Sequence, residues 1–197
     1  MTIRIRPCAD ADIDAIGRVV NAAAVAYAGV IPADCYHVPY MPPRELHGEI
    51  ESGVCFWGWY DDRAAERQPD GPADDTSTSP PGDERLLGVM GIQDVADVTL
   101  IRHAYVLPGE QGSGIGRQLL AKLVDLATRP LLVGTWADAV WAVRFYERNG
   151  FTLVSTAEKS RLLRRYWSIS SRQVETSVVL HRPLLKTHGV DSGAGSG

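Results

Sequence analysis

The stretch YVLPGEQGSGIGRQLL, from Tyr105 to Leu120, decides how this chain of 197 residues is interpreted. Four of its glycines fall within eight residues, and an apolar pattern of helical period follows them. The run VTLIRHAYV, from Val98 to Val106, predicts a strand that leads into the turn. The first N–H groups of a helix have no partner within it, and the helix dipole favours negative charge there. Strand, glycine-rich turn and helix together therefore predict an anion site.

Two common phosphate-binding motifs compete for this turn. A P-loop needs Gly-Lys-Ser/Thr at the end of its glycine run, but Gly116 is followed by Arg117 and Gln118, which excludes it. A dinucleotide fold uses G-x-G-x-x-G near the first strand. The segment GSGIGRQL (Gly112–Leu119) lies mid-chain and has Leu119 where that spacing wants glycine, so this motif is disfavoured.

The turn instead resembles the acyl-coenzyme A signature of the GCN5-related N-acetyltransferases, the GNAT superfamily. The pattern Q-x-x-G-x-G is present at Gln111, Gly114 and Gly116. A second block, WAVRFYERNGF at Trp141–Phe151, looks like the family's A-x-x-F-Y-E-x-x-G-F helix and strand. The two blocks follow in the family's order. The resemblance extends from Ile3 to about Leu180, the N-terminal part in pattern only.

The pattern of elements agrees with that family. Apolar runs predict strands at residues 3–6, 54–60, 86–92, 98–106, 131–136, 151–155 and 173–180. Helices are expected at residues 44–53, 115–126, 138–150 (closed by Gly150) and 158–167. A further helix should follow a cap at Asp10 or Asp12. Its expected inner face is Ile13, Ile16, Val20, Ala23 and Tyr27, and that of residues 115–126 is Ile115, Leu119, Leu123 and Leu126.

This order predicts an α/β (α+β) fold in one domain, residues 1–186. The resemblance implies a central mixed, mostly antiparallel sheet, flanked by helices and splayed in the middle to hold acetyl-CoA. Residues from about 61 to 84 are rich in Pro, Gly, Asp, Ser and Thr, so we expect a disordered acidic loop between two adjacent strands. Residues 187–197 are expected to form a disordered tail.

The resemblance also implies the residues of the site. Backbone N–H groups of the turn would cradle the coenzyme A pyrophosphate, and the strand before it would hold the pantetheine arm and the thioester. The matching positions are Ala104, Tyr105, Val106, Gln111, Gly112, Ser113, Gly114, Ile115, Gly116 and Arg117. A backbone N–H near Val106 would stabilise the tetrahedral oxyanion. Tyr146 occupies the place of the family's tyrosine, which protonates the departing thiolate.

The chain departs from the family pattern at two positions. Ala139 stands where the family often has an asparagine, and Leu100 where many members have a glutamate that acts as base. His103, on the same strand, is the candidate base. Strand alternation does not tell on which face of the sheet its side chain lies, particularly if the strand is bulged. Asp94 and Asp97 are weaker candidates and fit turn residues. The tryptophans, with Tyr60, are core residues by default. Some of those from the N-terminal region (Trp57, Trp59 and Tyr60), together with Tyr27 and Tyr36, are also candidates for an acceptor pocket.

Composition limits the class of protein. Residues 101–197 carry 13 basic against seven acidic residues, which suits an anionic small ligand or a solvated basic surface. We expect a cytoplasmic protein with reduced thiols and no metal, because Cys8, Cys35 and Cys55 lack metal-ligand spacing and no signal-peptide segment is present. Nucleic acid and membrane are not expected as partners, whereas a homodimer is possible.

The expected function is therefore an N-acetyltransferase that moves an acetyl group from acetyl-CoA to a primary amine by direct attack. A small-molecule acceptor is slightly favoured over a protein. The alternatives are a non-catalytic coenzyme A-binding sensor or scaffold, and a nucleotide-binding protein.

Overall fold

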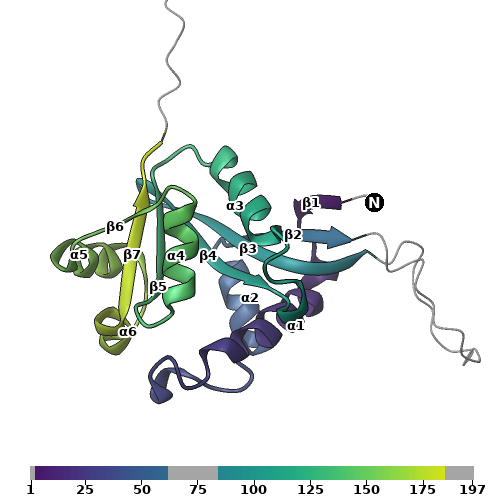
Figure 1. The fold of residues 1–197 in the computed structure, drawn as a ribbon, viewed down its shortest axis with the longest axis horizontal. Coiled ribbons are helices and arrows are strands. Elements are labelled where there is room, and N and C mark those ends of the chain that lie inside the picture. Colours follow the sequence, from purple (N-terminus) through teal and green to yellow (C-terminus); the bar gives the residue numbers. More distant parts are fainter. Residues whose placement is uncertain (1–2, 62–83, 185–197) are drawn as a thin grey trace, which may run out of the picture.

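The computed structural model describes residues 3–61 and 84–184 (Figure 1). Its strands are β1 (Ile3–Pro7), β2 (Cys55–Asp61), β3 (Arg85–Val95), β4 (Val98–Val106), β5 (Leu131–Trp136), β6 (Thr152–Leu153) and β7 (Ser177–Arg182). Its helices are α1 (Ile13–Ala24), α2 (Pro43–Glu51), α3 (Ile115–Leu126), α4 (Val140–Arg148), α5 (Thr156–Tyr166) and α6 (Ser171–Thr176). Most of the expected acidic loop, and all of the expected tail, lie outside the described residues.

All seven strands form one mixed sheet in the order β1-β2-β3-β4-β5-β7-β6. Every neighbouring pair is antiparallel except β4 and β5, which run parallel. The predicted α/β fold with a mostly antiparallel mixed sheet is confirmed. The strands on either side of the acidic segment, β2 and β3, are direct neighbours, as expected.

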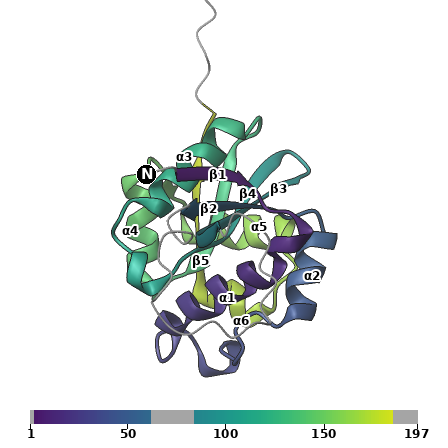
Figure 2. The same cartoon turned by 90° about the vertical axis from the view of Figure 1, so that its right-hand side faces the viewer.

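The sheet separates two layers of helices. Successive strand residues point to opposite faces, so Ile101 packs with α3 and α4 whereas Leu100 packs with α5 and α6. A third cluster, which includes Val89 of β3, packs α1 and α2 on the same face as α5 and α6. Figure 2 shows α3 and α4 on one side of the sheet and α1, α2 and α6 on the other. The protein therefore buries both faces of its sheet.

One glycine sets the position of the helix that follows the glycine turn. A Cβ atom on Gly88 of β3 would lie 2.5 Å from Cγ2 of Ile115, the first residue of α3. Real Cβ atoms do not approach so closely, so only glycine lets α3 lie this near the sheet. The start of α3 is thereby fixed next to the end of β4.

Five local expectations were wrong. Asp12 precedes α1, but its carboxylate accepts from Arg6 and the Ala9 N–H and does not cap the helix. Tyr27 lies in a 3-10 turn (Val25–Tyr27) beyond α1, and Leu126 is 41% exposed while Leu120 is buried. The strand expected at residues 151–155 shrinks to the two residues of β6. The strand expected from residue 173 begins at Ser177, since a capping box of Ser170 and Gln173 starts α6.

Candidate functional site

The sheet opens between β4 and β5. The two strands pair only over Thr99–Ile101 and Leu131–Val133, although β4 continues to Val106 and β5 to Trp136. Beyond Ile101 they diverge, and a cavity of about 980 Å³ is lined by residues from both sides of the sheet. The splay that the family resemblance implied is therefore present, and it joins the two faces of the sheet.

The glycine turn lies at one end of this cavity. Gly112 and Gly114 have φ angles of +83° and +93°, a backbone conformation that residues other than glycine rarely adopt. Gln111 Nε2 donates to the carbonyl oxygen of Val106 over 3.2 Å, which ties the turn to the end of β4. The glutamine of the motif thus holds the backbone in place.

The turn leaves a row of backbone donors without partners. The first hydrogen bond of α3 runs from the Gln118 N–H to the carbonyl oxygen of Gly114 over 3.0 Å. Among the residues that the structure describes, the N–H groups from Gln111 to Arg117 have no hydrogen-bond partner. Arg117 and Arg148 also line the cavity. Free donors at the N-terminus of a twelve-residue helix, with two guanidinium groups near by, fit a pyrophosphate.

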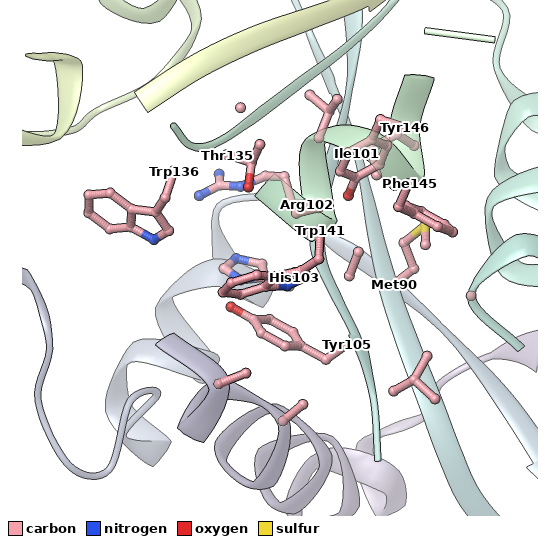
Figure 3. Close-up of a pocket in the computed structure, with 18 of the residues that line it drawn as sticks. Met90, Ile101, Arg102, His103, Tyr105, Thr135, Trp136, Trp141, Phe145 and Tyr146 are labelled. Atoms are coloured by element: carbon pink, nitrogen blue, oxygen red, sulfur yellow. The ribbon is translucent and has the colours of Figure 1, made fainter. Parts of the chain in front are cut away.

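Tyr146 enters the cavity from α4, among apolar neighbours. Its ring lies edge-on to Phe145 and Phe151, with ring centroids 5.1 and 5.6 Å away, and only 5% of the residue is exposed. Its hydroxyl makes no hydrogen bond within the described part of the chain, and the residue lines the cavity beside Ile101 (Figure 3). Burial raises the pKa of the phenol well above its ordinary value, with a smaller contribution from Tyr27. Tyr146 therefore stays protonated and can act as a donor.

His103 lies on a bulge of β4. Val89 pairs with Tyr105 and Gly91 with Arg102, so two residues of β4 face a single residue of β3. His103 has a φ angle of +50°, which is unusual for a residue with a side chain. The bulge turns the imidazole toward Glu49 of α2, and the ring packs against Phe56 of β2 with ring centroids 5.6 Å apart. The face that the sequence left open is thus the face of α1 and α2.

Glu49 of α2 is the residue that sequence reasoning missed. One carboxylate oxygen lies 3.1 Å from Nε2 of His103, and the other accepts from Arg102 over 3.0 Å. Glu49 Oε2 and His103 Nε2 are both buried and are not aligned for a hydrogen bond, and neither atom has another partner among the described residues. Burial opposes ionisation of Glu49, but His103 and Arg102 together lower the pKa of its carboxyl. Glu49 and His103 are far apart in the sequence, so no motif or spacing predicts that they lie together.

The ring nitrogens of His103 therefore differ in their surroundings. Nε2 is directed into the protein, toward Glu49. The residue also lines the cavity, and Nδ1 has no hydrogen-bond partner among the described residues. Nδ1 is consequently the nitrogen that a ligand can reach.

The other candidates from the sequence lie elsewhere. Asp94 accepts from Thr99 and pairs with Arg129, whereas Asp97 accepts from Tyr166 and Arg165, and neither lines the cavity. Leu100 and Ala139 are fully buried. The default assignment of the tryptophans to the core holds for Trp59 but is wrong for Trp141, which is 46% exposed. Trp136 and Trp167 are partly buried and line the cavity, and Trp167 also packs against the core cluster of α5.

Residues 80–153 match the family model described as "Acetyltransferase (GNAT) domain". That segment contains β4, the glycine turn, α3 and α4, which line the cavity. Among proteins of curated function, none matches this sequence.

Solved structures share the fold across nearly the whole chain. PaiA N-acetyltransferase from Thermoplasma acidophilum, in complex with coenzyme A, is 15% identical with a TM-score of 0.64, covering 93% of this chain and 99% of its own. YncA from Salmonella typhimurium, with acetyl-CoA, is 17% identical with a TM-score of 0.56 and coverage of 98% and 99%. The ribosomal-protein-S18-alanine N-acetyltransferase from Escherichia coli is 14% identical, with a TM-score of 0.56 and coverage of 96% and 98%. The family model matched by residues 80–153 is that of the GNAT acetyltransferase domain, and the fold that the whole chain shares with these structures is the GNAT fold.

Among the described residues, no helix is both long and apolar enough to span a bilayer.

Proposed function

We propose that this protein transfers the acetyl group of acetyl-CoA to the primary amine of a small molecule. The observation that carries the proposal is the row of free N–H groups from Gln111 to Arg117, which opens into the gap between β4 and β5. The turn would hold the pyrophosphate, and the backbone from Ala104 to Val106, which does not pair with β5, would hold the pantetheine arm. The resemblance, the family model and the fold support the same donor.

The gap would let the two substrates meet. Tyr146 belongs to the face of α3 and α4, and His103 to the face of α1 and α2. A donor entering along the glycine turn and an amine entering past α1 would approach each other through the opened sheet. Direct attack in a ternary complex then needs no covalent enzyme intermediate, and holding the reactants together supplies much of the rate.

The reaction balances with these residues. His103 would take a proton from the amine at Nδ1, while Glu49 faces Nε2 and stabilises the positive charge on the ring. The amine nitrogen forms a bond to the thioester carbon, and a backbone N–H near Val106 would stabilise the oxyanion. As the carbon–sulfur bond breaks, the electron pair leaves on sulfur and Tyr146 donates its proton to that sulfur. The proton held at Nδ1 of His103 then passes through solvent to the phenolate of Tyr146, which restores both residues. The products are an amide and the free thiol.

The raised pKa of Tyr146 sharpens its expected role. A phenol near its ordinary pKa would exchange its proton with a thiolate almost evenly, but the buried phenol holds its proton more tightly. The hydrogen bond that it donates to the developing thiolate should therefore carry most of its effect.

Thiol release from acetyl-CoA in the presence of an amine panel tests the proposal. Tyr146→Phe should lower kcat by about a hundredfold, the scale of one general acid, while coenzyme A binds as tightly as to the wild type. Binding can be measured by calorimetry. Unchanged turnover in Tyr146→Phe would remove the proposed acid, and coenzyme A binding without any turnover would favour a sensor or scaffold.

A further inference from the structure

The end of the cavity opposite the glycine turn is lined by aromatic rings. Six aromatic side chains line it: Tyr27, Tyr40, Tyr105, Trp136, Trp141 and Trp167. We call this region the aromatic chamber. Figure 3 shows Tyr105, Trp141 and Trp136 below and to one side of the gap, away from Tyr146 and Phe145. The chamber therefore lies where the proposed acceptor would bind.

The rings come from separate parts of the chain and contact one another. Tyr27, which follows α1, stacks on Tyr40 with centroids 5.7 Å apart and meets Tyr105 of β4 edge-on at 6.3 Å. Trp141, at the start of α4, lies 5.7 Å from Tyr27. Trp136, at the end of β5, donates through Nε1 to the Tyr40 hydroxyl over 3.3 Å. These contacts hold the walls in defined orientations.

The six rings of the aromatic chamber are only partly buried. Trp141 is 46% exposed, and the other five side chains are half-buried. By contrast, Trp59 and Tyr60, in the interior, are at most 5% exposed. Partly exposed rings facing a common cavity offer apolar surface that a ligand can cover.

The chamber offers little negative charge. Burial raises the pKa values of Tyr27, Tyr40 and Tyr105, so their hydroxyls remain neutral. Among the described residues that line the cavity, the one carboxylate is Glu110, beside the glycine turn. Glu49 lies behind His103 and is already paired with it and with Arg102.

These observations separate two kinds of amine. A polycation would find no free carboxylate in the chamber to balance its additional charges. A single ammonium group can rest against tyrosine and tryptophan faces, and a flat ring can pack between them. We infer that the acceptor is a primary amine with one cationic nitrogen on a flat, apolar aromatic body, and that the aromatic chamber selects it. That the bound amine is then acetylated rests on the proposed function, whereas its binding in the aromatic chamber does not.

Equilibrium binding of four amines tests the inference. Calorimetry with the protein, both free and saturated with coenzyme A, would compare 2-phenylethylamine, tryptamine, n-butylamine and spermidine. The two aromatic amines should bind at least about tenfold more tightly than the other two, the scale of one or two aromatic contacts. Affinities for all four within about threefold, or tightest binding of spermidine, would overturn the inference.

A pair of variants at one position isolates the ring. Tyr40→Leu should lose most of the preference for aromatic amines, whereas Tyr40→Phe keeps the ring and should retain it. Trp136→Leu is the second test should Tyr40→Leu fail to fold, and it should lose the same preference. A preference that survives loss of the ring would assign selection to some other surface.

Thiol release with the same amines keeps the two proposals apart. If the aromatic amines bind selectively but release no thiol from acetyl-CoA, the proposed transfer fails and the chamber stands. If thiol is released equally with all four amines, the transfer stands and the chamber fails.

Discussion

The proposed donor end of the cavity presents the backbone of one continuous segment, whereas the proposed acceptor end presents side chains brought together from distant segments. From Gln111 to Arg117 the groups proposed to bind the donor are successive N–H groups, fixed by two glycines with positive φ. At the acceptor end, Glu49, His103, Tyr40 and Trp136 come from α2, β4, the segment before α2, and β5. A backbone site can be recognised as a short motif because its groups are adjacent in sequence. A side-chain site of this kind has no such motif.

Substitution of His103 should produce the largest effect and act only at the acceptor end. His103→Asn keeps a residue that tolerates positive φ but removes the proton acceptor, so the bulge should survive. Turnover with a good amine should fall about a hundredfold, and coenzyme A affinity should not change. Steady-state kinetics and calorimetry together provide the measurement. A parallel loss of coenzyme A affinity would mean that the two ends are not separate.

Substitution of Gly114 should act only at the donor end. Any side chain at a φ of +93° is strained, so Gly114→Ala should distort the turn and misdirect its N–H groups. Coenzyme A affinity should fall by about tenfold, while affinity for the amine stays at the wild-type level. Gly109→Ala is the matched control, because its Cβ would meet no atom within 4 Å and its φ is ordinary.

Substitution of Glu49 should have a smaller effect, through His103. Glu49→Gln removes a negative charge 3.1 Å from the imidazole and should lower kcat/KM about fivefold to tenfold, with partial recovery in Glu49→Asp. Steady-state kinetics measure the loss of rate, and calorimetry should show unchanged coenzyme A affinity. An equal loss of coenzyme A affinity would indicate a role in folding alone.

Substitution of Asp12, which is remote from both ends of the cavity, should lower only the stability of the protein. This effect should be the smallest of the four. Asp12 accepts two hydrogen bonds from Arg6, and although burial opposes it, these contacts and the Ala9 N–H lower its pKa. Asp12→Asn should lower the free energy of unfolding by about 1 kcal/mol at neutral pH. The loss is small because the ion pair is partly exposed and solvent screens it. The folded-state pKa is depressed, so this contribution is present above the ordinary value of 3.8 and is lost as pH falls through the folded value. Denaturant titrations of both proteins across that range measure the difference, and both ends should keep wild-type affinity.

The sequence predicted most elements because their signals are local. β4 runs from Val98 to Val106 as expected, and Gly150 ends α4 with a φ of +82°. The helix of α6 was missed although its capping box, Ser170 with Gln173, stands in the sequence. Periodicity gave the buried face of α3 but not its limits, so Leu126 was expected inside and Leu120 was not. How far a helix stays covered depends on the elements packed against it.

The acceptor end depended on tertiary contacts of high sequence separation. His103 was a candidate from its strand, but its face followed from the bulge and from Phe56 and Glu49, about fifty residues earlier. The three tryptophans of the aromatic chamber were expected in the core because bulky apolar residues usually lie there. Their exposure to the cavity arises from the divergence of β4 and β5 after Ile101.

The sequence by itself determined the geometry of the glycine turn, since free N–H groups, left-handed glycines and a helix start within seven residues favour an anion wherever that segment folds. Tyr146 was a candidate through the resemblance of Trp141–Phe151 to the family's motif, because its spacing on an amphipathic helix alone fits a core residue. Only the tertiary structure decided that Glu49 faces His103, that the sheet opens from one face to the other, and that the aromatic rings surround the opening. Those features depend on strand register and helix packing, which join residues far apart in the chain and leave no fixed spacing in the sequence.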